Sequence, residues 1–387
     1  MTPQPQAAQS APAAPRPSPI IADPAAKDRP AVIRDGRVMR IAQIAPLSEA
    51  VPPLLYGGTE RIVAYLCDEL VALGHDVTLF ASADSKTAAR LEPSWANALR
   101  LDPTIRDYLA PHICMLEQLA RRADEFDIVH LHVDYLGYPI MRRAGVPYLT
   151  TLHGRLDLPE LQPIYQIFGE VPVISISDSQ REPLPAANYV ATVHHGLPKN
   201  LLLPGSGAGG YLAFLGRISP EKAPDAAIRI AARAGMKLKI AAKVDKADED
   251  YFQETIVPLL DQPHVEFLGE IGERDKSAFL GGASGLLFPI AWREPFGLVM
   301  IEAMACGTPV VAFRNGSVPE VIEDGVTGFV VDDEQQAAAA VGRLGGLDRT
   351  AIRRTFDRRF TARRMAEDYL RIYHGLIARR HPLQKAV

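Results

Sequence analysis

Short apolar segments alternate with helix-length amphipathic segments along most of this 387-residue chain. The first pair consists of residues 40–45, which resemble a strand, and residues 59–73, whose apolar side chains recur at the spacing of one helix face. We expect Thr59 to cap this helix and Gly74 to follow its end. Strands that alternate with helices form parallel sheets, because parallel neighbours need a long crossover connection. The alternation therefore predicts an α/β fold.

The pattern occurs twice. Further strands are predicted in the first half at residues 77–81, 128–132, 148–152, 173–176 and 190–193, and in the second half at residues 211–215, 238–242, 265–268, 286–289, 310–313 and 329–331. These segments are continuously apolar, as in sheets that helices cover on both faces. Residues 199–210 have no periodicity and separate the halves. We predict two doubly wound parallel-sheet domains, residues 37–200 and 201–360, followed by a C-terminal segment, residues 361–387.

Composition limits the class of protein. The net charge of −4 lacks the basic excess of a nucleic-acid-binding protein. No apolar run reaches the roughly 18–20 residues that span a bilayer. Three widely spaced cysteines predict neither a disulfide framework nor a zinc site, so we expect a cytoplasmic protein. Residues 1–36 are rich in Pro and Ala and are predicted to form a disordered tail.

Two loops that follow predicted strands carry residues suited to an anionic ligand. Ligands of such folds bind at the carboxyl ends of the strands, and two facing domains would place the site between them. Gly57 and Gly58 would let the backbone approach a phosphate at a helix N-terminus, although a flexible turn fits equally well. Arg217 and Lys222 follow the first strand of the second half, where they could neutralise a diphosphate or remain solvated cations.

A third segment, residues 294–312, contains two carboxylates eight positions apart. Glu302 lies among apolar residues of a predicted helix, where a carboxylate is costly unless it accepts hydrogen bonds. Ribose hydroxyls are suitable donors, and free backbone N–H groups near Phe296 and Gly297 could bind a phosphate or a sugar hydroxyl. The alternative is a capping Glu294 and a surface Glu302.

This segment, Glu-Pro-Phe-Gly-x4-Glu-Ala-Met-Ala-x-Gly-x-Pro-Val, closely resembles glycosyltransferase family 4, a retaining group with the GT-B fold of two Rossmann-like domains facing across a cleft. The Gly-Arg-x4-Lys run from Gly216 to Lys222 and the Gly57-Gly58 loop also match, and the resemblance covers residues 40–378. It implies that the last helix crosses back to the first domain. It also implies a nucleotide-sugar co-substrate and no metal or other cofactor.

The resemblance implies a role for each motif residue. The residues are grouped here by the part of the donor they would contact: Gly57, Gly58, Arg217 and Lys222 for the diphosphate; Glu294, Phe296, Gly297 and Leu298 for the sugar; Glu302 for the ribose; Leu268, Gly269, Glu270 and Ile271 for the base. His153 and Glu294 are the implied catalytic residues. The chain departs from the frequent family residues at 194–198 and at Ala242.

Several alternatives stay open at this point. The donor could be a UDP-, GDP- or ADP-sugar, and the acceptor a glycan, a lipid or a small molecule. A nucleotide-sugar epimerase, a glycan phosphorylase or a non-catalytic nucleotide-sugar-binding subunit would use the same architecture. His130, His132 and Asp134 could be metal ligands, but no third cluster completes such a site. Residues 248–250 resemble a metal-binding Asp-x-Asp motif but fit a helix start better. The arginine-rich stretch 353–380 fits a solvated face, or peripheral contact with an anionic membrane.

Overall fold

The computed structural model describes residues 37–54 and 57–384, so the predicted tail at residues 1–36 lies outside the described part of the chain. The first sheet has seven strands, all parallel, in the order β3-β2-β1-β4-β5-β6-β7. The strands are β1 (Arg40–Ile44), β2 (Asp76–Ser82), β3 (Arg90–Trp95), β4 (Ile128–Leu131), β5 (Tyr148–Thr151), β6 (Val173–Ser175) and β7 (Tyr189–Thr192). The helices of this half are α1 (Gly58–Ala72), α2 (Leu109–Arg121), α3 (Tyr138–Ala144) and α4 (Leu161–Ile167).

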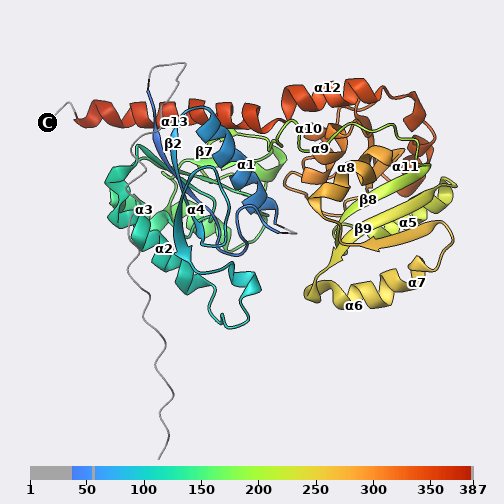
Figure 1. Cartoon of the computed structure of the whole chain (residues 1–387), viewed down its shortest axis with the longest axis horizontal. Helices are drawn as coiled ribbons and strands as arrows, with labels where there is room; N and C mark the ends of the chain where they lie inside the picture. Colours follow the sequence, from blue (N-terminus) through green and yellow to red (C-terminus); the bar gives the residue numbers. More distant parts are fainter. Residues whose placement is uncertain (1–36, 55–56, 385–387) are drawn as a thin grey trace, which may run out of the picture.

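The second sheet has six described strands, also parallel, in the order β10-β9-β8-β11-β12-β13. They are β8 (Tyr211–Ile218), β9 (Lys237–Val244), β10 (Val265–Gly269), β11 (Gly285–Phe288), β12 (Val310–Phe313) and β13 (Gly328–Val331). The helices are α5 (Pro224–Arg233), α6 (Glu249–Tyr251), α7 (Val257–Leu260), α8 (Glu273–Gly282), α9 (Leu298–Ala305), α10 (Val318–Val321), α11 (Glu334–Val341) and α12 (Arg349–Arg359). The fold class predicted from the alternation is confirmed, with two helix-covered parallel sheets lying side by side (Figure 1).

Both sheets are held by burial of the apolar runs seen in the sequence. In β1, for example, Ile41, Ala42 and Ile44 are completely buried. Helix α1 covers that strand with an apolar face that includes Ile62 and Leu66. Each such side chain contributes about 1.5–3 kcal/mol when it leaves water.

Two predictions of local structure were wrong. Helix α1 begins at Gly58 with Gly57 as its N-cap, so Thr59 lies inside the first turn and does not cap it. Strand β3 was missed because it is an edge strand that pairs only with β2, and its half-buried residues include Pro93. An edge strand needs no continuous apolar run, which was the signal used for the others.

The last helix, α13 (Ala362–Gln384), crosses from the second half to the first (Figure 1). Its residues Met365, Ala366, Tyr369 and Tyr373 are buried in the same core as α1 and β1. A backbone bridge between Leu197 and Thr361 ties the crossing point to the connection between the halves. The last helix is therefore part of the first half's core.

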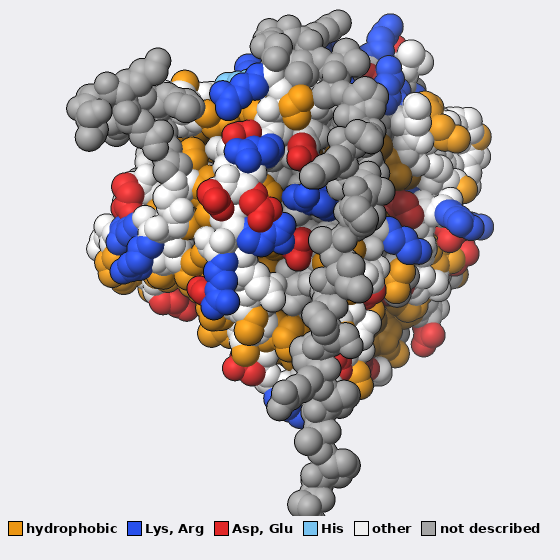
Figure 2. All heavy atoms as spheres, turned by 60° about the vertical axis from the view of Figure 1, so that its left-hand side comes forward, with side chains coloured by type: hydrophobic (Ala, Val, Ile, Leu, Met, Phe, Trp, Pro, Cys, Tyr) orange, Lys and Arg blue, Asp and Glu red, His pale blue; other side chains and the backbone are white. Residues whose placement is uncertain are grey.

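The arginines of α13 lie among carboxylates. Arg364 and Asp368 form an ion pair with 2.6 Å between them, and Arg363 contacts Glu367 at 3.1 Å. On the face turned forward in Figure 2, positive and negative side chains are likewise interspersed. No described helix combines the length and the apolar character needed to cross a membrane.

Candidate active site

A cleft of about 590 Å³ lies between the two halves, which is the size of a small-molecule site. It brings together most of the residues predicted from the sequence, namely Gly57, Gly58 and His153 from the first half and Arg217, Lys222, Glu270, Ile271, Glu294, Phe296, Gly297, Leu298 and Glu302 from the second. Leu268 and Gly269 are not among the lining residues, and the Leu268 side chain is exposed at the end of β10. Parallel strands direct their carboxyl ends to one edge, which is why residues so distant in sequence meet there.

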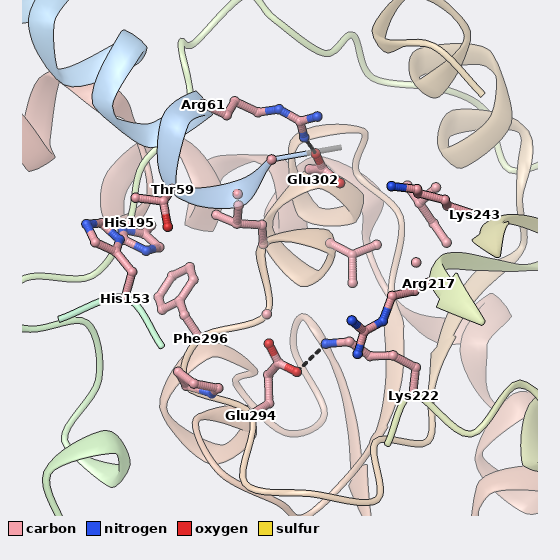
Figure 3. A pocket seen from close by; sticks show the side chains of 18 of the residues that line it. Thr59, Arg61, His153, His195, Arg217, Lys222, Lys243, Glu294, Phe296 and Glu302 are labelled. Atoms are coloured by element: carbon pink, nitrogen blue, oxygen red, sulfur yellow. Dashed lines mark hydrogen bonds and ion pairs between the residues drawn. The ribbon is translucent and has the colours of Figure 1, made fainter. Parts of the chain in front are cut away.

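Glu294 lies at the centre of the second half's wall and is tied to two side chains. Its Oε2 accepts hydrogen bonds from Lys222 Nζ and, at 2.9 Å, from Trp292 Nε1 (Figure 3). Lys222 follows β8, whereas Glu294 precedes α9, so the contact joins two strand-end loops. The pair places one cation and one carboxylate side by side in the cleft.

Helix α9 starts at the same place. Gly297, its N-cap, has φ +78°, and a side chain there would come within 2.8 Å of Met300. Only glycine fits this left-handed, crowded position. The first N–H groups of a helix have no partner within the helix, so the start of α9 offers hydrogen-bond donors beside Glu294.

Arg217 is surrounded by acidic side chains. It lies near the end of β8, with Asp248 at 3.4 Å, Glu221 at 3.4 Å and Asp245 at 3.8 Å. The alternative role of residues 248–250 in metal binding finds no support here, because Asp248 faces this guanidinium. Among the described residues, no group of His, Cys, Asp or Glu side chains is arranged to hold a metal ion.

Glu302 is buried inside α9 and bonded to two cations. Its Oε1 lies 2.6 Å from Lys276 Nζ. The same oxygen lies 3.2 Å from Arg61 Nη1 (Figure 3). Burial by itself would raise the pKa of Glu302, but the charges of Lys276 and Arg61 outweigh burial and lower it. The surface alternative for Glu302 is therefore wrong, since its side chain is an ionised group inside the cleft wall.

Lys276 and Arg61 belong to the site although no sequence motif pointed to them. Lys276 is on α8 and is only 6% exposed, and Arg61, on α1, reaches across the cleft to Glu302. Glu273 joins both, at 3.2 Å from Lys276 and 3.7 Å from Arg61. A buried carboxylate predicts that some cation is near. Which cation it is depends on how the two halves face each other, because Arg61 comes from the other half.

A cluster of histidines lies on the first half's side of the site. His153 follows β5, and its Nε2 lies 2.9 Å from Nδ1 of His132, which follows β4. The His153 ring also stacks on His195, with 5.3 Å between ring centroids. Burial lowers the pKa of His153 to about 3 and that of His195 well below its usual range. These rings are therefore neutral at physiological pH.

The sequence matches two family models. Residues 56–213 match the model described as Glycosyltransferase Family 4, and residues 207–344 match Glycosyl transferases group 1. The chain belongs to these glycosyltransferases. Among curated relatives, the D-inositol 3-phosphate glycosyltransferase of Acidothermus cellulolyticus is 28% identical over 74% of this chain and 78% of its own. That of Saccharomonospora viridis is 28% identical over 87% of this chain and 94% of its own.

Solved structures of glycosyltransferases share the fold. AviGT4, which is involved in avilamycin A biosynthesis, superimposes with a TM-score of 0.67 at 24% identity, covering 88% of this chain and 98% of that one. Sucrose-phosphate synthase of Thermosynechococcus elongatus gives 0.72 at 20% identity, with coverages of 88% and 99%. Anabaena HepE in complex with UDP and glucose gives 0.69 at 18% identity, with coverages of 87% and 100%. The protein is thus a glycosyltransferase of the GT-B type.

Proposed function

We propose that this glycosyltransferase moves a hexose-type sugar from a nucleoside-diphosphate sugar to an acceptor hydroxyl, with retention of anomeric configuration and without a metal ion. The observation that carries the proposal is the meeting of Lys222, Arg217 and the start of α9 on one wall of a single cleft, with His153 opposite. Two cations and a helix N-terminus together suit the two negative charges of a diphosphate.

Donor binding would exchange partners within the site. Lys222 pairs with Glu294, and a diphosphate would give its ammonium group a second anionic partner. Glu294 would then accept hydrogen bonds from the sugar while Trp292 Nε1 keeps holding the same oxygen, Oε2. Glu302 has its Oε1 fixed by Lys276 and Arg61, an arrangement that would orient Oε2 for the ribose hydroxyls.

The chemical step we propose is a front-side displacement. The bond between the anomeric carbon and the diphosphate oxygen breaks, and the acceptor oxygen forms its bond to the same face of that carbon. The acceptor's proton passes to the departing phosphate oxygen. Negative charge grows on the diphosphate in the transition state, so Lys222, Arg217 and the first N–H groups of α9 would stabilise it more than the ground state.

The candidates for the donor base, the donor sugar and the acceptor can be reduced by testing the compounds named for relatives. HepE structures contain UDP, glucose or UDP-glucose, and several relatives at 26–28% identity carry the name D-inositol 3-phosphate glycosyltransferase. UDP-, GDP- and ADP-sugars would be screened first by thermal shift, because a ligand that binds the folded state raises the melting temperature. Inositol 3-phosphate would head the acceptor panel.

The deciding assay follows the anomeric proton of the product by NMR. We expect release of nucleoside diphosphate that depends on an acceptor, and a product with the donor's anomeric configuration. An inverted product would contradict retention. Epimerised nucleotide sugar without acceptor, or turnover that requires inorganic phosphate, would instead identify an epimerase or a phosphorylase.

A further inference from the structure

A continuous chain of hydrogen bonds runs from His153 at the cleft to the C-terminal helix. His153 Nε2 lies 2.9 Å from His132 Nδ1, and His132 Nε2 lies 2.8 Å from Gln43 Oε1. Gln43 Nε2 donates to Tyr373 Oη at 3.0 Å, and that hydroxyl lies 2.7 Å from His130 Nδ1. The five side chains come from β1, β4, two strand-end loops and α13, so the chain connects parts of the sequence up to 330 residues apart.

These polar groups lie in the interior, where apolar side chains would cost less free energy to bury. Gln43, His130 and Tyr373 are completely buried, and His132 is 2% exposed. A buried polar group costs stability unless each of its hydrogen bonds is made, and a fully bonded network fixes the orientation of every member. The chain of bonds therefore holds the rings in one arrangement directly behind His153.

The donor and the acceptor in the hydrogen bonds on either side of His132 can be assigned. Burial lowers the pKa of His132 and His130 well below the usual range and that of His153 to about 3, so each ring is neutral and carries one N–H. The carbonyl oxygen of Gln43 can only accept, which places the His132 proton on Nε2. His132 Nδ1 must then accept, so the proton of His153 is on Nε2. The remaining His153 nitrogen, Nδ1, is buried and has no hydrogen-bond partner among the described residues.

We propose that Gln43 and Tyr373 are positioning residues for His153: they hold its proton on Nε2 and leave Nδ1 as an acceptor for a hydroxyl of the ligand in the cleft. Tyr373 acts by receiving the Gln43 amide N–H and donating its own proton to His130, which keeps the Gln43 carbonyl directed at His132. This inference rests on the proposed function, in which His153 lies opposite the cations that bind the donor. A sugar that lacks the contacted hydroxyl would leave Nδ1 without a partner and would be selected against.

The direct test is the tautomer of His153 in the unliganded, full-length enzyme. Two-bond proton–nitrogen spectra of histidine-labelled protein distinguish protonated from unprotonated ring nitrogens, and the His153 signals are assigned by their loss in His153→Gln. We expect protonated Nε2 and unprotonated Nδ1 in the wild type. Tyr373→Phe keeps the ring but removes the hydroxyl, and Gln43→Leu removes the amide. In both variants we expect the Nδ1-protonated form of His153 to appear.

Kinetics separate positioning from a merely structural role. In Tyr373→Phe we expect kcat to fall on the order of tenfold, as for the loss of about one hydrogen bond, with the donor KM nearly unchanged. Tyr165→Phe is the matched control, because Tyr165 is equally buried in the first half but lies outside the chain of bonds. It should alter neither the tautomer nor kcat.

Two results would overturn the proposal: a wild-type His153 protonated on Nδ1, or an unchanged His153 tautomer in both Tyr373→Phe and Gln43→Leu. The spectra need no substrate, so they separate this inference from the proposed function. If the tautomers behave as expected but the wild-type enzyme turns over no nucleotide sugar, the proposed function fails and the positioning role stands.

Discussion

Two regions of the cleft, one around His153 and one on the second half, use different chemistry. Around His153 the first half presents neutral rings whose charges burial has removed, linked by hydrogen bonds. The second half presents ion pairs, Lys222 with Glu294 and Lys276 with Glu302. Neutral acceptors and donors suit hydroxyl groups, whereas cationic side chains suit a diphosphate. The difference teaches that the second half is built for the anionic part of a nucleotide sugar, and the histidine cluster of the first half for an uncharged part.

Replacing Lys222 by methionine should have the largest effect, because it removes a charge that would stabilise the departing diphosphate and leaves Glu294 without its cation. We expect kcat/KM to fall by about 10²–10³-fold, as when a preorganised transition-state donor is lost. Steady-state kinetics measure this, with Lys237→Met, an exposed lysine of the same half, as control. A loss of kcat/KM of less than threefold would show that Lys222 does not act in the chemical step.

A buried carboxyl in the first half sharpens the contrast. Glu60 lines the cleft and is 5% exposed, and burial raises its pKa from the ordinary 4.5 to about 7. Because the folded pKa is raised, the stability that Glu60 contributes is complete below about pH 4.5 and is lost as the pH rises through about 7. A shift of this size corresponds to on the order of 3 kcal/mol.

Glu60→Gln should therefore gain stability relative to wild type as the pH rises from 5 to 8. We expect the difference in melting temperature to change by about 4 °C in favour of the variant over that range. Exposed Glu117→Gln is the control and should show no such trend. If the difference stayed constant with pH, burial would not raise the pKa of Glu60, and this carboxyl would be ionised across the whole range.

A smaller effect is expected for Glu302→Gln, which weakens the proposed bonds to ribose. Charge-assisted hydrogen bonds contribute about 1.5–3 kcal/mol, so the Kd for the nucleoside diphosphate should rise roughly 10- to 100-fold while the chemical step changes less. Calorimetry measures the Kd, and Glu266→Gln, a surface carboxyl of the same half, is the control. Unchanged affinity would refute the ribose assignment.

Excess EDTA should have the smallest effect of all. Lys222, Arg217 and the start of α9 supply positive charge where many enzymes use a metal ion, so we expect turnover to be unchanged after chelation. Activity that disappears in EDTA and returns with magnesium or manganese would show that the charged wall works through a metal ion.

Much of the fold was predictable from the sequence because buried parallel strands consist of continuous runs of apolar residues. The polar edge strand β3 was not, since it pairs with only one neighbour and is mostly half-buried. In the site, the motif residues from Gly57 to Glu302 come together as their positions after strands suggested, except Leu268 and Gly269. The partners of Glu302 could not be foreseen, because Arg61 reaches it from the other half. Nor could the bond between Gln43 and Tyr373, which depends on where the last helix lies in space.

The most direct test of the division between the walls is hydrogen–deuterium exchange with two ligands. A nucleoside diphosphate alone should protect the second half, at residues 216–222 and at the start of α9. The intact nucleotide sugar should add protection in the first half around residues 153–154. Equal protection of both halves by the nucleoside diphosphate alone, or protection by the sugar nucleotide confined to the second half, would contradict the account.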